Sequence, residues 1–208
     1  GQLDRIPPVR SRLAEVQMRT REDRAWMKAE LVNRGQDLDN PGDVAVHAVR
    51  VVVERLGIRC GGFCRVLENG SLLPSRDRTI GDAADIETGF GLARLDAGLM
   101  EQLAMAGPVE IDGGPMAVVD CTAQLCALVR RGKPVALFWF AADRERGWRD
   151  GEAQALQAIV ELAYAHYGRA QARRAAKAGE RRLMLVADWM PQLAWLARGD
   201  GQTVWFNQ

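Results

Sequence analysis

Pro134-Val135-Ala136-Leu137-Phe138-Trp139-Phe140-Ala141 is an apolar run that follows Arg131-Gly132-Lys133. A strand that is apolar at nearly every position is buried on both faces and lies in the middle of a sheet. The stretch Gln124–Arg130 comes just before it, and the glycine-containing segment between the two is suited to a tight turn. We therefore predict a hairpin whose second strand is central and fully buried.

Other strand signals lie on both sides of this hairpin in the sequence. Ile58–Leu67 reads as a strand that places Cys60, Gly62 and Cys64 on one face by the two-residue period. Asn69-Gly70 is a strong hairpin signal, and a return strand begins after it at Ser71 to Pro74. Pro108 to Asp112 is a brief further strand. These segments predict an antiparallel sheet.

Two helices are expected before the first strand. From Val9 to about Arg34 the apolar residues recur every three or four positions but form only a thin stripe, which is typical of a helix paired with one partner helix. A second helix, Val44–Leu56, has a broad apolar face. Asn40 or Asp43 is suited to cap its start, and Gly57 is suited to end it.

Two more helices are expected after the first hairpin. A short one begins at Ala93 or Leu95 and ends at Met105, and a long one runs from Glu152 to about Asp188 with Asp150 as a plausible N-cap. Beyond Tyr167 the long helix becomes rich in arginine, which we interpret as the solvated face of a signalling helix. The predicted fold class is α+β, with an antiparallel sheet flanked by helices and long helices at both ends.

Composition excludes several functions. The chain has 208 residues and a formal net charge of +1, so no overall positive field favours nucleic acid or a membrane surface. No apolar run reaches the roughly 18 residues that a membrane span needs. We expect the four cysteines to be reduced thiols in the cytoplasm. Neither histidine, His47 or His166, stands in a phosphoacceptor signature.

The last residues predict the opening of a second domain. A strand at Leu193 to Ala197, a Gly-Asp-Gly turn and a strand at Thr203 to Phe206 form a hairpin that needs further strands or a helix to be stable. We therefore expect a piece of a longer modular protein. Its predicted parts are an N-terminal signalling helix at 1–34, a core domain at 35–150, a linker helix at 151–188 and the start of another domain at 189–208.

This order of elements resembles a GAF domain over roughly Trp26 to Arg173. The most specific part is Gly132–Phe140, followed by Trp148, Asp150 and Glu152 and then by the long helix with its arginine-rich end, which is similar to GAF domains of bacterial histidine kinases of the HWE type. The tail from Met190 resembles the start of a PAS domain. The resemblance implies a sensory module of a two-component sensor kinase that relays a signal through its helical linker.

The resemblance also implies a ligand pocket between the sheet and the middle loops. Its predicted lining is Cys60, Gly62, Cys64, Asp85, Cys126, Phe138 and Phe140. The loops from Arg76 to Phe90 match no known pattern, so neither a ligand nor a cofactor is identified. Asp85 stands in a segment faintly similar to the bilin-pocket motif of phytochromes. The alternative is a filled core, in a domain that acts only as a dimeric spacer.

Partners and competing functions follow from the same features. The thin stripes of the first and last helices predict a parallel, coiled-coil homodimer. The enzymatic alternative is a GAF-fold, thiol-dependent methionine sulfoxide reductase, which would need a thiolate beside a basic group; we expect no such group near Cys121 or Cys126. Zinc is disfavoured because residues four apart on a strand, such as Cys60 and Cys64, have Cα atoms about 13 Å apart. A third alternative is the sensor half of a transcription regulator or of a cyclic-dinucleotide enzyme.

Overall fold

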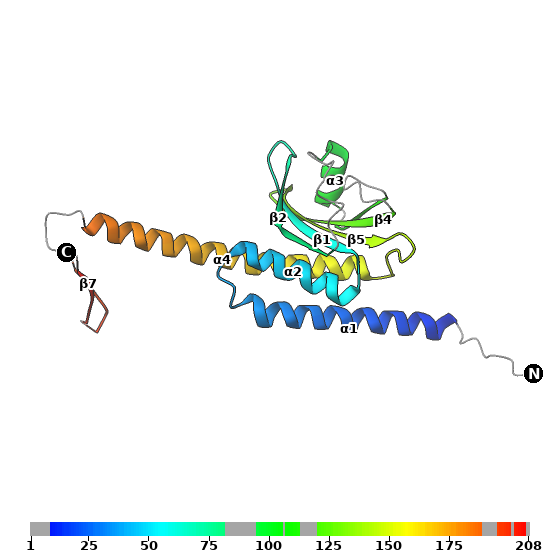
Figure 1. Ribbon diagram of the computed structural model, residues 1–208, viewed down its shortest axis with the longest axis horizontal. Coiled ribbons are helices and arrows are strands. Elements are labelled where there is room, and N and C mark those ends of the chain that lie inside the picture. The colour runs from blue at the N-terminus through cyan, green and yellow to red at the C-terminus, as the bar shows by residue number, and fades with distance from the viewer. Residues whose placement is uncertain are drawn as a thin grey trace, which may run out of the picture.

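The computed structural model describes residues 9–81, 95–105, 107–112, 120–188, 195–200 and 202–206. Its centre is a five-stranded antiparallel sheet with helices on both faces (Figure 1). Helices α1, α2 and α4 lie on one face and the short α3 on the other. The predicted class, an antiparallel α+β fold with long helices at both ends, is confirmed.

The sheet has the order β2-β1-β5-β4-β3, so the apolar strand β5 is central, as predicted. Both predicted hairpins form, β1 with β2 and β4 with β5. Arg131 and Gly132 form the second turn with φ angles of 52° and 73°, which suits a two-residue hairpin with left-handed central residues. The bounds are β1 Cys60–Val66, β2 Leu72–Gly81, β3 Val109–Asp112, β4 Cys121–Arg130 and β5 Lys133–Asp143.

The helices follow the predicted segments closely. They are α1 Val9–Gly35, α2 Pro41–Leu56, α3 Ala97–Met105 and α4 Glu152–Asp188. Of the two candidate caps for α2, the structure uses Asn40, whose side chain accepts a hydrogen bond from the Gly42 amide at 3.1 Å. Gly57 ends the same helix with a φ of 58°, a conformation that glycine adopts without steric cost.

Helices α1 and α4 lie side by side and run in the same direction. Thr20 Oγ1 near the middle of α1 donates to the Asp150 carbonyl just before α4 at 3.3 Å, and Gly35 lies against His166 fifteen residues further along α1 and sixteen further along the chain toward the end of α4. The thin stripe of α1 predicted one partner helix, but α1 packs on both α2 and α4. Met27 and Leu31 are 0% exposed, so the C-terminal half of α1 is docked in a groove between two helices.

Side chains of the central strands fill two separate cores because alternate residues point to opposite faces. Phe63, Cys126, Phe138 and Phe140 pack with α1, α2 and α4 in the helix-face core. The second core, which we call the α3-face core, includes the following residues: Cys60, Cys64, Leu95, Leu103, Cys121, Leu125, Leu137 and Trp139.

A separate two-stranded sheet follows α4. Strands β6 Trp195–Ala197 and β7 Thr203–Phe206 pair antiparallel, which agrees with the predicted hairpin; Leu193 and Ala194 lie outside the described residues. Among the described helices, none combines the length and the apolar character that crossing a bilayer requires.

Candidate functional site

A pair of glycines on β1 lets two aromatic rings of β5 lie flat against the sheet. Gly61 pairs with Phe140 and Gly62 with Trp139. A Cβ atom on Gly62 would lie 2.6 Å from Trp139 Cε2, and one on Gly61 would lie 2.8 Å from Phe140 Cδ1. Both distances are well below van der Waals contact, so each ring occupies the space that a side chain would need. The room that the small residue Gly62 was expected to leave for a ligand is filled by Trp139.

The residues predicted to line one pocket do not share a face of the sheet. Cys60 and Cys64 belong to the α3-face core, where Gly62 meets Trp139. Cys126, Phe138 and Phe140 belong instead to the helix-face core. The expectation that all of them line one cavity is therefore wrong. Asp85 lies outside the described residues.

Phe138 and Phe140, which were predicted to line the pocket, instead pack in the helix-face core. Phe138 lies 4.9 Å from Phe63 and 6.5 Å from Phe140, measured between ring centroids. Such tilted and offset ring pairs are favourable in a core. The side chains that β5 presents to the α3 face include Leu137, Trp139 and Ala141, and no signal within β5 distinguishes them, since every position from 134 to 142 is apolar.

Two of the four thiols behave as small apolar side chains. Burial raises the pKa of Cys64 to about 12, and it raises the pKa of Cys126 further still. Removing a thiolate from water is unfavourable, so burial disfavours the charged form. The Cys64 thiol donates to the Leu137 carbonyl at 3.7 Å. At neutral pH both remain protonated and contribute to packing.

Cys121 has a different environment. Arg59 Nη1 donates to its Sγ atom at 3.4 Å, and the same guanidinium lies 3.8 Å from Asp143 Oδ1. The expectation that no basic group lies beside Cys121 is therefore wrong. Cross-strand register explains the contact: Arg59 N bonds to Ala141 O on β5, and Cys121 on β4 pairs with Asp143. The arginine and the cysteine are 62 residues apart in sequence, so no local pattern could reveal them as neighbours.

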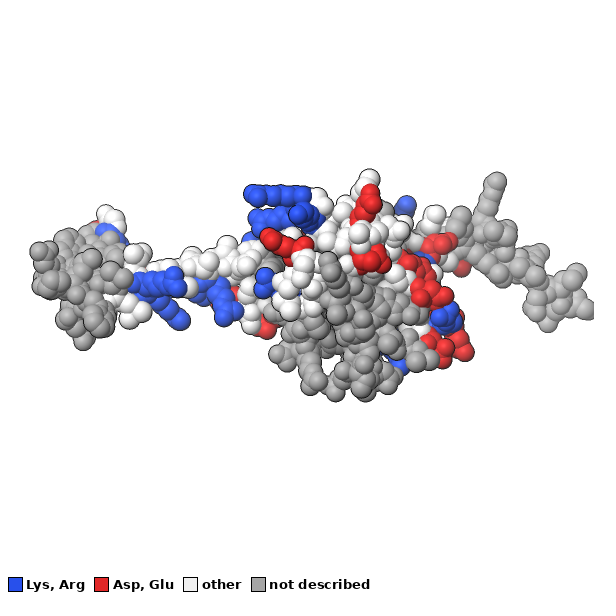
Figure 2. All heavy atoms as spheres, turned by 90° about the horizontal axis from the view of Figure 1, so that it is seen from above, with Lys and Arg blue, Asp and Glu red and all other residues white. Residues whose placement is uncertain are grey.

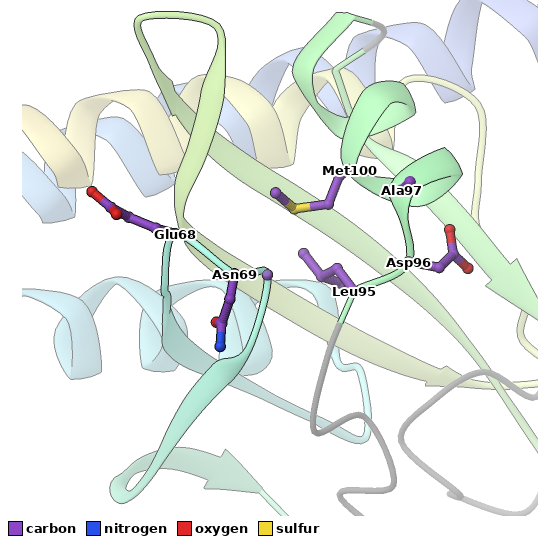
Figure 3. Close-up of a pocket in the computed structure, with 7 residues that line it drawn as sticks. Glu68, Asn69, Leu95, Asp96, Ala97 and Met100 are labelled. Atoms are coloured by element: carbon purple, nitrogen blue, oxygen red, sulfur yellow. The ribbon is translucent and has the colours of Figure 1, made fainter.

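An open groove lies where the β1–β2 turn meets the start of α3. It holds about 600 Å³ and includes Glu68, Asn69, Leu95, Asp96 and Met100 in its lining. Figure 3 shows Leu95 and Met100 at its centre, while the carboxylates of Glu68 and Asp96 point outward. The Leu95 amide bonds to Gly70 O at 2.9 Å, and Asp96 Oδ1 caps α3 by accepting from the Leu99 amide at 2.7 Å. The polar groups of the groove thus hold its walls together.

A second groove of about 560 Å³ shares Glu68 and Met100 with the first. Its far wall is the β4–β5 turn with Arg130, Arg131 and Lys133, which are all exposed. Exposed cations of this kind interact weakly because solvent and salt screen them. Among the residues that the structure describes, no group of His, Cys, Asp and Glu side chains is placed to hold a metal ion.

The arginine-rich half of α4 does more than face solvent. Arg173 donates to the Gln36 carbonyl at 3.3 Å, and Lys177 Nζ lies 2.8 Å from Asp39 Oδ2. The hydrogen bond from Lys177, with its charge, lowers the pKa of Asp39. Cations near a helix C-terminus are favoured by its exposed carbonyls. These two residues therefore bind the end of α1 and the α1–α2 connection, which corrects the solvated-face interpretation for them.

Further along, the same helix is open to solvent. Residues 171–183 of α4 are exposed, and Figure 2 shows Lys and Arg gathered along this projecting half. Leu183 is 72% exposed and Leu185 is 61% exposed, so two large apolar side chains stand beside the charges. On α1, Met18 is 62% exposed. Both long helices thus carry apolar side chains that the described part of the chain does not cover.

No protein-family model matches the chain, and no curated protein does. Solved structures share its fold at low identity. The GAF domain of a putative sensor histidine kinase from Pseudomonas syringae pv. tomato is 16% identical, with a TM-score of 0.58 over 79% of this chain and 98% of that one. A free methionine-R-sulfoxide reductase from Neisseria meningitidis, solved with its substrate, is 15% identical, with a TM-score of 0.54 over 76% and 91%.

A bacteriophytochrome from R. palustris is 11% identical, with a TM-score of 0.56 over 78% of this chain and 41% of that one. The fold of the described sheet and helices is therefore that of GAF domains. At these identities the comparison establishes the fold alone, since one fold carries many functions.

Proposed function

We propose that the chain is the sensory and dimerisation module of a bacterial, cytoplasmic signal-transduction protein, with a two-component sensor histidine kinase as the parent. Helix α4 would relay the signal to a PAS domain that begins near residue 189. The observation that carries the proposal is α4 itself: its first half is buried on the sheet, and its second half continues past α1 and α2. A helix that is rigidly held at one end transmits a small displacement to the other.

The start of α4 is held by a largely buried ion pair and by a hydrogen bond to the sheet. Arg146 Nη2 lies 2.7 Å from Glu152 Oε1, and the same guanidinium donates to the Leu56 carbonyl at the end of α2. The Trp148 indole donates to Thr122 O on β4 at 3.3 Å. A change on the α3 face that shifts β4 or β5 thus reaches α4 directly. A ligand would bias two arrangements of α4 only by binding them with different affinity.

The proposed partner is a second copy of the chain. The parallel α1 and α4 carry exposed Met18, Leu183 and Leu185, which a parallel homodimer would cover. The cations of the two α4 helices would repel each other across such a dimer interface, so the apolar residues must supply its stability. A dimer interface of this kind is only marginally stable, as expected for a helix pair whose arrangement changes with signal state.

The dimer is tested by replacing Leu183 with glutamate and measuring association by sedimentation equilibrium. In a symmetric dimer the substitution removes one buried leucine from each copy, so we expect the dissociation constant to rise on the order of a hundredfold. The matched control is Gln171→Glu, which adds the same charge at an exposed position of α4. A chain that is monomeric before substitution, or equal weakening by both variants, contradicts the proposal.

A second candidate, thiol-dependent sulfoxide reduction, is favoured by Arg59 beside Cys121. Against it stands the spacing of the thiols. Cys60 and Cys121 share a face but are separated by two strand spacings and by two residues along the strand, so their Cα atoms are about 12 Å apart. A disulfide requires less than about 7 Å.

We therefore expect the purified chain to reduce free methionine sulfoxide no faster than dithiothreitol alone. Turnover above that rate that disappears in Cys121→Ser, but persists in the matched Cys126→Ser variant, would establish the reductase instead. Cys126 is suited as the control because it lies on the opposite face of the sheet.

A further inference from the structure

Both histidines of the chain pack against the last turns of α1, and they do so from two different helices. His47 on α2 is buried, with its Nε2 atom 3.5 Å from the Glu30 carbonyl oxygen. His166 on α4 lies against Gly35, where an added Cβ atom would be 3.4 Å from the imidazole Nδ1. Histidine is the side chain whose charge ordinarily changes between about pH 5 and 8. Both of the chain's histidines thus lie where α1 docks.

His166 is placed so that a positive charge on it would be costly. The residue is only 3% exposed, and its Nε2 atom has no hydrogen-bond partner among the described residues. Arg169 and Arg173 repel a proton on the ring from its own helix, and these effects with burial outweigh a hydrogen bond with the Gly35 backbone of α1, which by itself favours the protonated ring. A protonated ring would be a buried cation beside two others, which is unfavourable.

The carboxylates of the neighbouring segments already have partners other than the histidines. Glu30 of α1 lies 3.1 Å from Arg34, and Asp39 of the α1–α2 connection lies 2.8 Å from Lys177. On α2, Asp43 and Arg50 lie one helical turn either side of His47, and the Asn40 side-chain amide donates to Asp43. Among the described residues, the charges that act on His166 are those of Arg169 and Arg173, and no carboxylate stabilises its protonated ring.

The direction of the pH effect follows from the burial of His166. Burial, with the charges of Arg169 and Arg173, lowers the pKa of His166 below its ordinary value. The ring therefore binds a proton more readily when α1 is released than when α1 is docked. Docking is fully stable above the ordinary pKa of about 6.5 and weakens as the pH falls below it.

We infer that the docking of α1 against α2 and α4 is a pH-sensitive latch, in which protonation of His166 releases the C-terminal half of α1. Docking is a contact within one chain. Only its consequence for signalling rests on the proposed function, because α1 and α4 are the proposed dimer and relay helices. A chain that proved monomeric would remove that consequence and leave the latch intact.

The test is backbone hydrogen exchange of the whole chain at about pH 7.5 and about pH 5.5, corrected for the intrinsic pH dependence of exchange, with β5 as internal reference. One pH unit below the ordinary pKa, we expect protection of residues 27–35 to fall several-fold, with about tenfold as the upper limit, while β5 is unchanged. His166→Gln, which cannot be charged, should show a fall of less than about twofold.

Equal protection of α1 at both pH values in the unmodified chain would overturn the inference. So would an undiminished fall in His166→Gln. If His166→Gln loses protection in β5 and so does not fold, the imidazole of His166 is titrated by NMR in the unmodified chain. A midpoint clearly below 6.5 supports the latch, and a midpoint at or above it overturns the latch.

Discussion

Replacing Glu152 with glutamine is expected to destabilise the chain by about 3 to 5 kcal/mol, because it leaves a largely buried guanidinium without its counter-charge. Glu152 is only 4% exposed and receives both terminal nitrogens of Arg146, at 2.7 and 3.0 Å. Its Oε2 also accepts from the Arg149 amide at 2.9 Å, so one carboxylate orders the turn that begins α4. The measurement is the free energy of unfolding from chemical denaturation.

The matched control for that experiment is Glu161→Gln, further along the same helix. Glu161 is exposed, and its side chain accepts a hydrogen bond only from Gln157 among the described contacts. We expect it to change the free energy of unfolding by less than about 0.5 kcal/mol. If Glu152→Gln cost no more than Glu161→Gln, the ion pair would not be the anchor of α4.

Replacing Gly62 with alanine is expected to cost about 3 kcal/mol, although only one methyl group is added. Its Cβ atom would lie 2.6 Å from two carbons of the Trp139 ring, which is 1% exposed and belongs to the central strand. The ring cannot swing away, because the sheet and the α3-face core enclose it. Gly179→Ala is the matched control: nothing lies within 4 Å of that position in α4, and alanine should stabilise the helix by up to about 1 kcal/mol.

A double variant separates this clash from other effects of the substitution. Trp139→Leu removes the ring and is itself expected to be destabilising. With the ring gone, Gly62→Ala should add much less than its single-variant cost, since neighbours in contact are not additive. Full additivity of the two changes would mean that the ring does not occupy the space beside Gly62.

The backbone elements could be predicted from the sequence because their signals are local. The apolar run of β5 implied a central strand, Asn40 and Gly57 marked the ends of α2, and the turn glycines marked both hairpins. The candidate site could not be predicted in the same way. The two-residue period groups residues within a strand, but it does not say which face of β5 lies beside Cys60 and Cys64. That depends on the pairing of Gly62 with Trp139, which is a long-range register.

Long-range register also explains the other contacts that the sequence did not predict. The contact of Arg59 with Cys121 requires three strands in register, and the binding of Arg173 to the end of α1 requires two helices to be aligned in parallel. An arginine row on a helix predicts exposure when read alone. Only the packed structure shows that Arg173 in this row contacts an exposed carbonyl at the end of α1.

We propose that α4 pairs with its own copy in a parallel dimer, and the distance between the two copies of α4 is the decisive measurement. A spin label is attached at Ala178→Cys, an exposed position of α4, while the native cysteines are buried. Electron-spin measurements then give the separation between labels on different molecules. Helices packed 8–10 Å apart predict a single distance of roughly 10–25 Å, allowing for the label arms. A distance beyond roughly 40 Å, or no coupling between molecules at all, would rule out the parallel dimer.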